Sequence, residues 1–110
     1  MSKTALGTVT ISPVAVRTVV SLTTLSVPGV VSMSSDFMSG LREIARRRRP
    51  IHGVHVDMSH GVVVDVHIAA ESGTSLSDLG ERVQRAVTEA AERLLGLSPS
   101  AVNVFVDEMR

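Results

Sequence analysis

Alternating apolar residues in the second half of the chain constrain its fold most strongly. Apolar residues occupy every second position in two stretches, residues 54–58 and 62–70, which are separated by Ser59, His60 and Gly61. An alternation of period two places the apolar side chains of a strand on one face and the remaining side chains on the other. We therefore predict a β-hairpin with one buried face, whose opposite face carries histidine and aspartate.

A first helix is predicted directly after the N-terminal residues. Ser12 suits the N-cap, and Pro13 suits the first helical position because it needs no backbone N–H there. The helix is expected over residues 14–26 and should end before Pro28 and Gly29, which do not continue a helix. Its residues at helical spacing are Ala15, Val19, Leu22 and Leu25.

A second, longer helix is predicted after the hairpin. Ser75 and Asp78 resemble a capping box at its start, and Gly96 marks its end. Between them one apolar stripe repeats at helical spacing, as expected for a helix with one buried face. The stripe consists of Leu76, Leu79, Val83, Ala86, Val87, Ala90 and Leu94.

Three further strands complete the predicted order, over Leu6–Ile11, residues 30–33 and Ala101–Val106. In the last of these, valines at 102, 104 and 106 alternate with Asn103, Phe105 and Asp107. The order is βαβ, a basic helix or loop, then ββαβ, so the fold class is α+β. We predict a two-layer α/β sandwich with both helices on one face of a mixed sheet. A chain of 110 residues suits a single domain, 1–110, with a basic excursion at about 36–50.

Composition and motifs argue against catalysis. The chain has no cysteine, tryptophan or tyrosine, which excludes disulfides, thiol nucleophiles and thiolate metal sites. It has no G-x-S-x-G element, P-loop, dinucleotide-binding glycine motif or H-E-x-x-H pair. We therefore predict a protein that is not an enzyme and that has no cofactor and no small-molecule substrate.

Four residues of the hairpin form the candidate metal site. His55, Asp57, Asp65 and His67 share the face opposite the valines, and imidazole with carboxylate suits zinc or iron. The same residue types also form an ordinary polar sheet face with cross-strand His–Asp pairs. A third interpretation is a proton-sensitive contact surface, since histidine changes charge near neutral pH. The ordinary polar sheet face is the interpretation that the spacing favours, so we predict no metal site and keep the other two as alternatives.

Protein contacts are the activity that the pattern favours. The sheet face that carries Val63, Ala69 and Phe105 offers a modest apolar patch among polar residues. Short strands such as Leu6–Ile11 or Ala101–Val106 also offer unpaired backbone groups at a sheet edge. We therefore expect the protein to associate with itself or with a partner protein, with Val63 and Phe105 on the contact face.

Basic residues are concentrated in the middle of the chain. Residues 1–50 carry seven basic and two acidic groups, whereas residues 51–110 carry four basic and nine acidic ones. Arg42 and the run Arg46, Arg47, Arg48 and Arg49 are candidates for contact with an anionic partner, because guanidinium groups bind phosphate in a bidentate manner. An ordinary solvated or protein-docking basic helix is the preferred interpretation, and anionic membrane lipids and nucleic acid are the alternatives. The scarcity of aromatic residues, which stack on bases, disfavours nucleic acid without excluding it.

The cellular location is also predicted from the sequence. No apolar stretch reaches the roughly 20 residues that a membrane span needs. The first residues lack the apolar core of a signal peptide. We therefore expect a cytoplasmic protein.

The ordered motifs resemble the alkaline shock protein twenty-three / Gls-twenty-four family of Gram-positive bacteria along nearly the whole chain. The terminal unit is the most specific part: Val83-Gln84 in the second helix, followed by Val102-Asn103-Val104-x-Val106 in the last strand. Other matching segments are Gly7–Pro13, Val27–Val30, Gly53–Val56, Gly61–Val66, Glu81–Val87 and Gly96–Val106.

The resemblance implies a small non-enzymatic protein of cell-envelope homeostasis or general stress. It also implies a peripheral location at the inner face of the membrane, where a small membrane-anchored partner protein holds some relatives, and it transfers no catalytic residue. Residues 36–49 match no motif of that family, so the role of the arginine run rests on charge alone. Arginine-rich, lysine-poor composition with many valines and alanines suggests a GC-rich genome such as that of an actinobacterium.

Overall fold

The computed structural model of the chain describes residues 2–4, 6–34 and 53–110. These described residues form one four-stranded sheet, a separate two-stranded ribbon and two helices, the second of which ends in a π-helical turn. In chain order the elements are β1 (Ser2–Thr4), β2 (Gly7–Val9), α1 (Pro13–Leu25), β3 (Val30–Met33), β4 (Val54–Asp57), β5 (Val63–Ala70), α3 (Leu76–Ala90), η2 (Ala91–Leu95) and β6 (Ala101–Met109).

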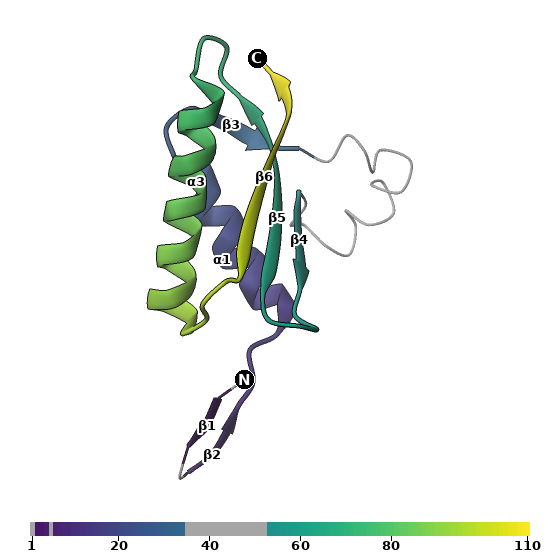
Figure 1. The fold of residues 1–110 in the computed structure, drawn as a ribbon, viewed down its shortest axis with the longest axis vertical. Coiled ribbons are helices and arrows are strands. Elements are labelled where there is room, and N and C mark those ends of the chain that lie inside the picture. Colours follow the sequence, from purple (N-terminus) through teal and green to yellow (C-terminus); the bar gives the residue numbers. More distant parts are fainter. Residues whose placement is uncertain (1, 5, 35–52) are drawn as a thin grey trace.

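Strand β5 organises the sheet, because each of the other three strands pairs with it. On one edge, β4 pairs antiparallel with the first half of β5 and β3 pairs antiparallel with its second half. On the other edge, β6 runs parallel to β5 along its whole length. Both helices lie on one face of this mixed sheet, as Figure 1 shows. The predicted α+β class and two-layer arrangement are confirmed.

Strands β3 and β4 meet at His67, in the middle of β5. The His67 N–H donates to the Gly53 carbonyl at 2.7 Å, and the His67 carbonyl accepts from the Ser34 N–H at 2.8 Å. Gly53 has φ +77°, and a Cβ built there would lie 2.8 Å from the Ser34 carbonyl oxygen and 2.9 Å from that of His67. Only glycine fits this junction without displacing backbone.

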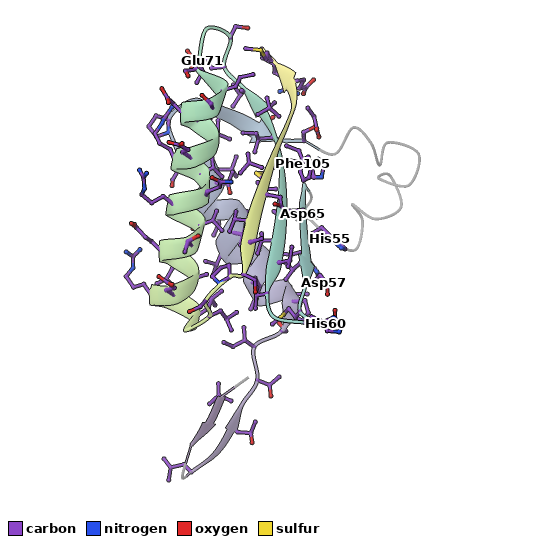
Figure 2. All side chains as sticks on the ribbon, in the orientation of Figure 1. His55, Asp57, His60, Asp65, Glu71 and Phe105 are labelled. Atoms are coloured by element: carbon purple, nitrogen blue, oxygen red, sulfur yellow. The ribbon has the colours of Figure 1, made fainter. Side chains whose placement is uncertain are left out.

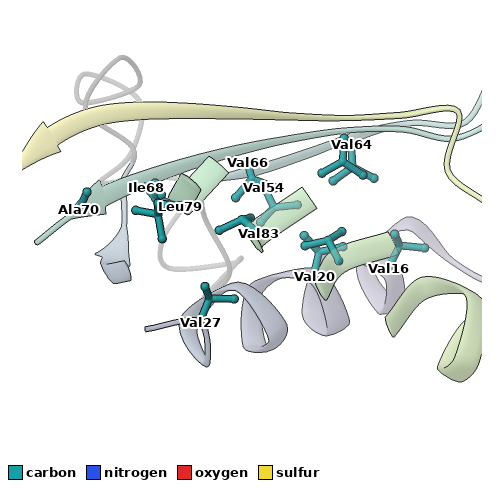
Figure 3. Close-up of a cluster of buried hydrophobic side chains, with 12 residues drawn as sticks. Val16, Val20, Val27, Val54, Val64, Val66, Ile68, Ala70, Leu79 and Val83 are labelled. Carbon is teal, nitrogen blue, oxygen red and sulfur yellow. The ribbon is translucent and has the colours of Figure 1, made fainter. Parts of the chain in front are cut away.

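The core lies between the helices and the inner face of the sheet (Figure 3). The predicted alternation is confirmed in both hairpin strands. The even-numbered residues of β5 are buried, and those of β4 are buried or half-buried while His55 and Asp57 are exposed. Valine dominates, as expected for a buried β surface packed by β-branched side chains. The buried cluster is Val16, Val20, Val27, Val54, Val64, Val66, Ile68, Ala70, Leu79, Val83, Val87 and Val102.

Helix α1 begins and ends as predicted, but the buried face differs from the predicted one. The Ser12 hydroxyl accepts a hydrogen bond from the Ala15 N–H at 3.2 Å, which confirms the N-cap. Val16 and Val20 face the core, whereas Leu22 of the predicted stripe is 65% exposed. The helix is apolar on several sides, so periodicity alone did not determine which side packs against the sheet.

The second helix starts after Ser75 and ends at Gly96 as predicted, and Gly96 is left-handed with φ +68°, but its cap and its last turn differ from expectation. Ser75 stands at the N-cap position, yet its side chain makes no capping hydrogen bond. The π-helical turn η2 rotates the following residues, so Ala91 is buried and Leu94 is 61% exposed. A π-turn inserts one residue into the helical repeat, which displaces the apolar stripe around the axis.

The predicted strand at Leu6–Ile11 forms only in part and does not join the main sheet. Gly7–Val9 pairs antiparallel with Ser2–Thr4 in a separate ribbon. This ribbon projects beyond the start of α1, away from the sheet (Figure 1). The strand cannot pair with β5, because β3 and β4 occupy one edge of β5 and β6 occupies the other. Ser12 also starts α1 soon after the ribbon, which leaves little chain to bring the ribbon back to the sheet.

Candidate functional site

The candidate site is the face of the main sheet that the two helices do not cover. We call it the outer face and define it by the side chains of His55, Asp57, Val63, Asp65, His67, Asn103, Phe105 and Asp107. They come from three adjacent strands, β4, β5 and β6, and are exposed or half-buried. Figure 2 shows His55, Asp65 and Phe105 on the side of the sheet away from the helices. The even-numbered valines of these strands thus lie on the inner face, as predicted, and the polar side chains lie together on the outer face.

The most ordered cluster of the outer face joins β5 to β6. The rings of His67 and Phe105 stack in parallel, with centroids 4.6 Å apart and planes 12° from each other. The His67 Nδ1 lies 3.0 Å from the Asp107 Oδ2. Phe105 remains 44% exposed, so one side of the stack is open to a partner. Val63, the second predicted contact residue, is half-buried on the same face.

Ala69 does not contribute to the apolar patch, contrary to expectation. It is fully buried, and it pairs with Ser32 on one side and with Glu108 on the other. Both pairings shift register next to Ala69, so the simple alternation of faces does not continue through it.

A second row of polar residues crosses the three strands nearer the hairpin turn. His55 lies opposite Asp65 in the antiparallel register, and Asp65 lies opposite Asn103 in the parallel register. The Asn103 side-chain amide donates to the Asp65 carboxylate at 2.9 Å. Sequence reasoning placed Asn103 and Asp107 on this side of β6 but missed their partners, because the alternation within a strand carries no information on register between strands.

Asp57 is held within its own turn. Its carboxylate accepts hydrogen bonds from the Ser59 backbone N–H at 3.0 Å and from the Ser59 hydroxyl at 2.7 Å. These two bonds, the backbone one first, hold the pKa of Asp57 below its ordinary value, and the nearby His60 and His55 lower it further.

Three of the four metal candidates therefore have separate hydrogen-bond partners, and His55 lies opposite Asp65 in the strand register. His67 bonds to Asp107, Asp65 to Asn103, and Asp57 to Ser59. Across residues 6–34 and 53–110, no three histidine, aspartate or glutamate side chains lie close enough together to share one metal ion. A cation at this face would have to displace existing hydrogen bonds.

The long edge of β6 that faces away from β5 is the second part of the site. Within the part of the chain that the structure describes, β6 pairs with β5 and with no other strand. At the start of this edge, the Gln84 side-chain amide on α3 donates to the Val102 carbonyl at 3.0 Å. The two halves of the most specific family motif thus touch each other. The motif signalled Gln84, but the sequence did not predict this bond.

The arginine candidates, Arg42 and the run Arg46, Arg47, Arg48 and Arg49, lie outside the described residues. The two residues that flank this part of the chain, Ser34 and Gly53, are both tied to the His67 backbone. Among the helices that the structure describes, none has both the length and the hydropathy to cross a membrane.

Comparison with known proteins identifies relatives in Gram-positive bacteria. The chain is 28% identical over 111 residues to the uncharacterized protein YloU of Bacillus subtilis, covering 98% of this chain and 92% of that one. It is 26% identical to the uncharacterized protein YqhY of the same organism, over 94% of this chain and 77% of the relative. It is also 28% identical to the uncharacterized protein Spy1614 of Streptococcus pyogenes, over 94% of this chain and 88% of the relative.

No solved structure matches the chain. The sequence model of the alkaline shock protein twenty-three family, described as having a cell envelope-related function, matches residues 1–110, the whole chain. This match and the relatives confirm the resemblance found in the sequence motifs, and the chain therefore belongs to the alkaline shock protein twenty-three family.

Proposed function

We propose that this protein acts by contact, without catalysis, as a self-assembling scaffold or adaptor in cell-envelope homeostasis. We further propose that a membrane-anchored partner protein recruits it to the inner face of the membrane. The envelope-related function of the family supports the setting. The observation that carries the proposal is the outer face, which the described helices leave uncovered although it spans three strands and presents an exposed aromatic ring.

The chemistry of the outer face suits a protein partner. An interface core needs apolar and aromatic side chains with a polar rim around them. Phe105 and Val63 supply the apolar part, and Asp65, Asn103 and His55 supply hydrogen-bonding groups beside it. The stack between His67 and Phe105 fixes the orientation of the phenyl ring before a partner arrives, which lowers the entropy that binding costs.

The test compares two exposed apolar residues on opposite sides of the molecule. Phe105→Ser removes the aromatic ring from the outer face, and Leu94→Ser is the matched control on η2, where the side chain is 61% exposed. We expect the wild type and Leu94→Ser to associate at micromolar concentration in sedimentation velocity, and Phe105→Ser to associate at least tenfold more weakly. Equal association of all three would place the contact elsewhere.

Recruitment to the membrane has a separate readout. In native cells we expect the wild type to co-purify with the membrane fraction, and Phe105→Ser to move to the soluble fraction. A wild type that stays wholly in the soluble fraction, with no membrane-anchored protein cross-linked to it, would contradict this part of the proposal.

A second candidate function is contact with an anionic surface through Arg42 and Arg46–Arg49. The specific observation behind it is the run of four adjacent arginines within the basic half of the chain. Replacing the four with glutamine should abolish binding to vesicles that contain anionic lipid and leave thermal unfolding unchanged. Binding of the wild type should also weaken steeply between low and physiological salt, because phosphate contacts are screened. A matching loss of binding to a DNA duplex would identify nucleic acid as the partner.

A further inference from the structure

The N-terminal ribbon is the part of the fold that the proposed function leaves without a role. We call strands β1 and β2 the N-terminal arm. The arm projects away from the sheet and the helices (Figure 1). Its two strands have three residues each, and the side chains of Leu6 and Val9 are 100% and 54% exposed. A two-stranded ribbon is marginally stable in water and gains stability from a third strand.

A suitable third strand would need a free edge, and β6 has one. The Arg110 N–H donates to the Ala70 carbonyl, whereas the His67 N–H and carbonyl bond to Gly53 and Ser34 on the opposite edge of β5. The backbone N–H and C=O groups of successive residues in a strand point to opposite sides, so those of the even-numbered residues of β5 point toward β6. In a parallel pair, the residue of β6 directly opposite one of these points its N–H and C=O away from β5.

The backbone groups on the outer edge of β6 can therefore be identified. Val102, Val104 and Val106 lie opposite Val64, Val66 and Ile68. Their N–H and C=O groups consequently point away from β5, and the bond from Gln84 to the Val102 carbonyl agrees with this direction. Beyond Val102 the edge continues past Val104 and Val106, and no strand of the described residues lies beside it.

Charge also matches between the arm and this edge. Lys3 is the one charged side chain in residues 2–9. The end of β6 and the residue after it carry two acids, Asp107 and Glu108, against one arginine, Arg110, which pairs with Glu108, so this end is negative overall. Opposite charges steer an encounter and favour one pairing over others.

We propose that the N-terminal arm of one copy adds to the outer edge of β6 in a second copy. This inference rests on the proposed function and names the contact that links one subunit to the next. We assign the edge to the arm of a second copy because the arm points away from its own sheet (Figure 1). Ser12, which follows the arm closely, caps α1 and so fixes this direction. Such a contact joins two different surfaces, so it builds chains or rings when each arm reaches a new copy and a closed pair when two copies exchange arms.

The first test mixes two complementary variants. One lacks residues 1–9 and keeps β6, and the other keeps the arm and carries Val104→Pro, which removes an outward N–H and keeps the pairing with β5. By sedimentation velocity we expect the wild type to form the largest species, each variant alone to associate no further than the outer face allows, and the mixture to gain a complex of both variants that neither forms alone.

The outcomes separate this inference from the proposed function. If the variant without residues 1–9 associates as strongly as the wild type, the arm is not the link, and association through another surface stands. If the wild type itself is monomeric, both this inference and the self-assembly in the proposed function are wrong. If mixing the two variants gives no complex beyond those that each forms alone, although circular dichroism shows both folded, the pairing of arm with edge is wrong.

A second test does not depend on Val104→Pro folding. The chain has no cysteine, so introduced cysteines report on single positions. A short bismaleimide should link Thr8→Cys protein to Asn103→Cys protein in high yield. It should link Thr8→Cys to Glu89→Cys, an exposed position on α3, in at least fivefold lower yield. Equal yields from the two mixtures would overturn the proposal.

Discussion

At the scale of single residues, His67 connects the construction of the sheet to its exposed face. Its backbone holds the ends of β3 and β4 through Ser34 and Gly53, on one edge of β5. Its side chain stacks on Phe105 and bonds to Asp107 on the outer face. A change at the junction is therefore expected to disturb the candidate contact surface as well as the stability of the sheet.

Gly53→Ala should lower the free energy of unfolding by about 2–5 kcal/mol, because the residue combines a positive φ with close backbone contact. The added Cβ meets two carbonyl oxygens that cannot move without breaking the pairing of β3 or β4 with β5. Urea unfolding followed by circular dichroism measures the change.

The matched control is Gly80→Ala, within α3, where an added Cβ meets nothing within 4 Å. There alanine should raise the stability by roughly 0.5–1 kcal/mol, since glycine costs more backbone entropy in a helix. Equal effects at the two glycines would show that the junction at His67 is not strained by a side chain.

Asp57 provides a prediction in which pH is the variable. Its pKa in the folded protein is lowered, so its favourable contribution to stability is present above the unfolded-state pKa and is lost as the pH falls through the folded-state pKa. Ser59→Ala removes the hydroxyl donor and keeps the backbone N–H, so the pKa of Asp57 should rise part of the way back. Carboxyl chemical shifts measured by NMR across acidic pH test this, and an unchanged midpoint in Ser59→Ala would contradict it.

At the scale of elements, β6 contributes to three parts of the molecule. Its valines pack toward the core, its intervening residues complete the outer face, and its far edge is unpaired within the described chain. Gln84 on α3 ties the start of this edge to the helix layer. In this chain the bond therefore joins the helix segment Val83-Gln84 to the strand segment that begins at Val102.

Gln84→Ala should cost about 0.5–1.5 kcal/mol, because the Val102 carbonyl loses its side-chain donor. Arg85→Ala, on the exposed neighbouring position of the same helix, should change stability by less than about 0.5 kcal/mol. Thermal unfolding of both variants makes the comparison. A larger loss for Arg85→Ala than for Gln84→Ala would show that the amide does not stabilise the edge.

Elements with strong local signals were predictable from the sequence. Alternation placed the hairpin strands and their buried face, and Ser12 with Pro13 placed the start of α1. The buried side of α1 was not predictable, since apolar residues occur around the helix and only packing selects Val16 and Val20. The π-turn after Ala90 and the separate ribbon also lack a local signal that propensity could detect.

The residues of the candidate site were predictable from the sequence, but the hydrogen bonds between them were not. Alternation placed His55, Asp65 and Phe105 on one face, as the structure does. The bonds from Asp65 to Asn103 and from His67 to Asp107 depend on the parallel register of β5 and β6. That register is fixed by the crossover through α3 and by packing, and these are properties of the whole fold.

At the scale of the whole molecule, two layers leave one side of the sheet without a cover. The helices bury the valine face, whereas the outer face and the arm are exposed in the described chain. An exposed face, an unpaired strand edge and a projecting ribbon are features that proteins use for contact. The envelope-related family gives this contact a cellular setting.

The most direct test of this view is sedimentation velocity of the wild-type protein from low to high micromolar concentration. We expect species heavier than the 11.7 kDa chain, with a proportion that rises with concentration and falls in Phe105→Ser. A single species at the mass of one chain throughout this range, in the presence and absence of a membrane extract, would contradict a function based on contact.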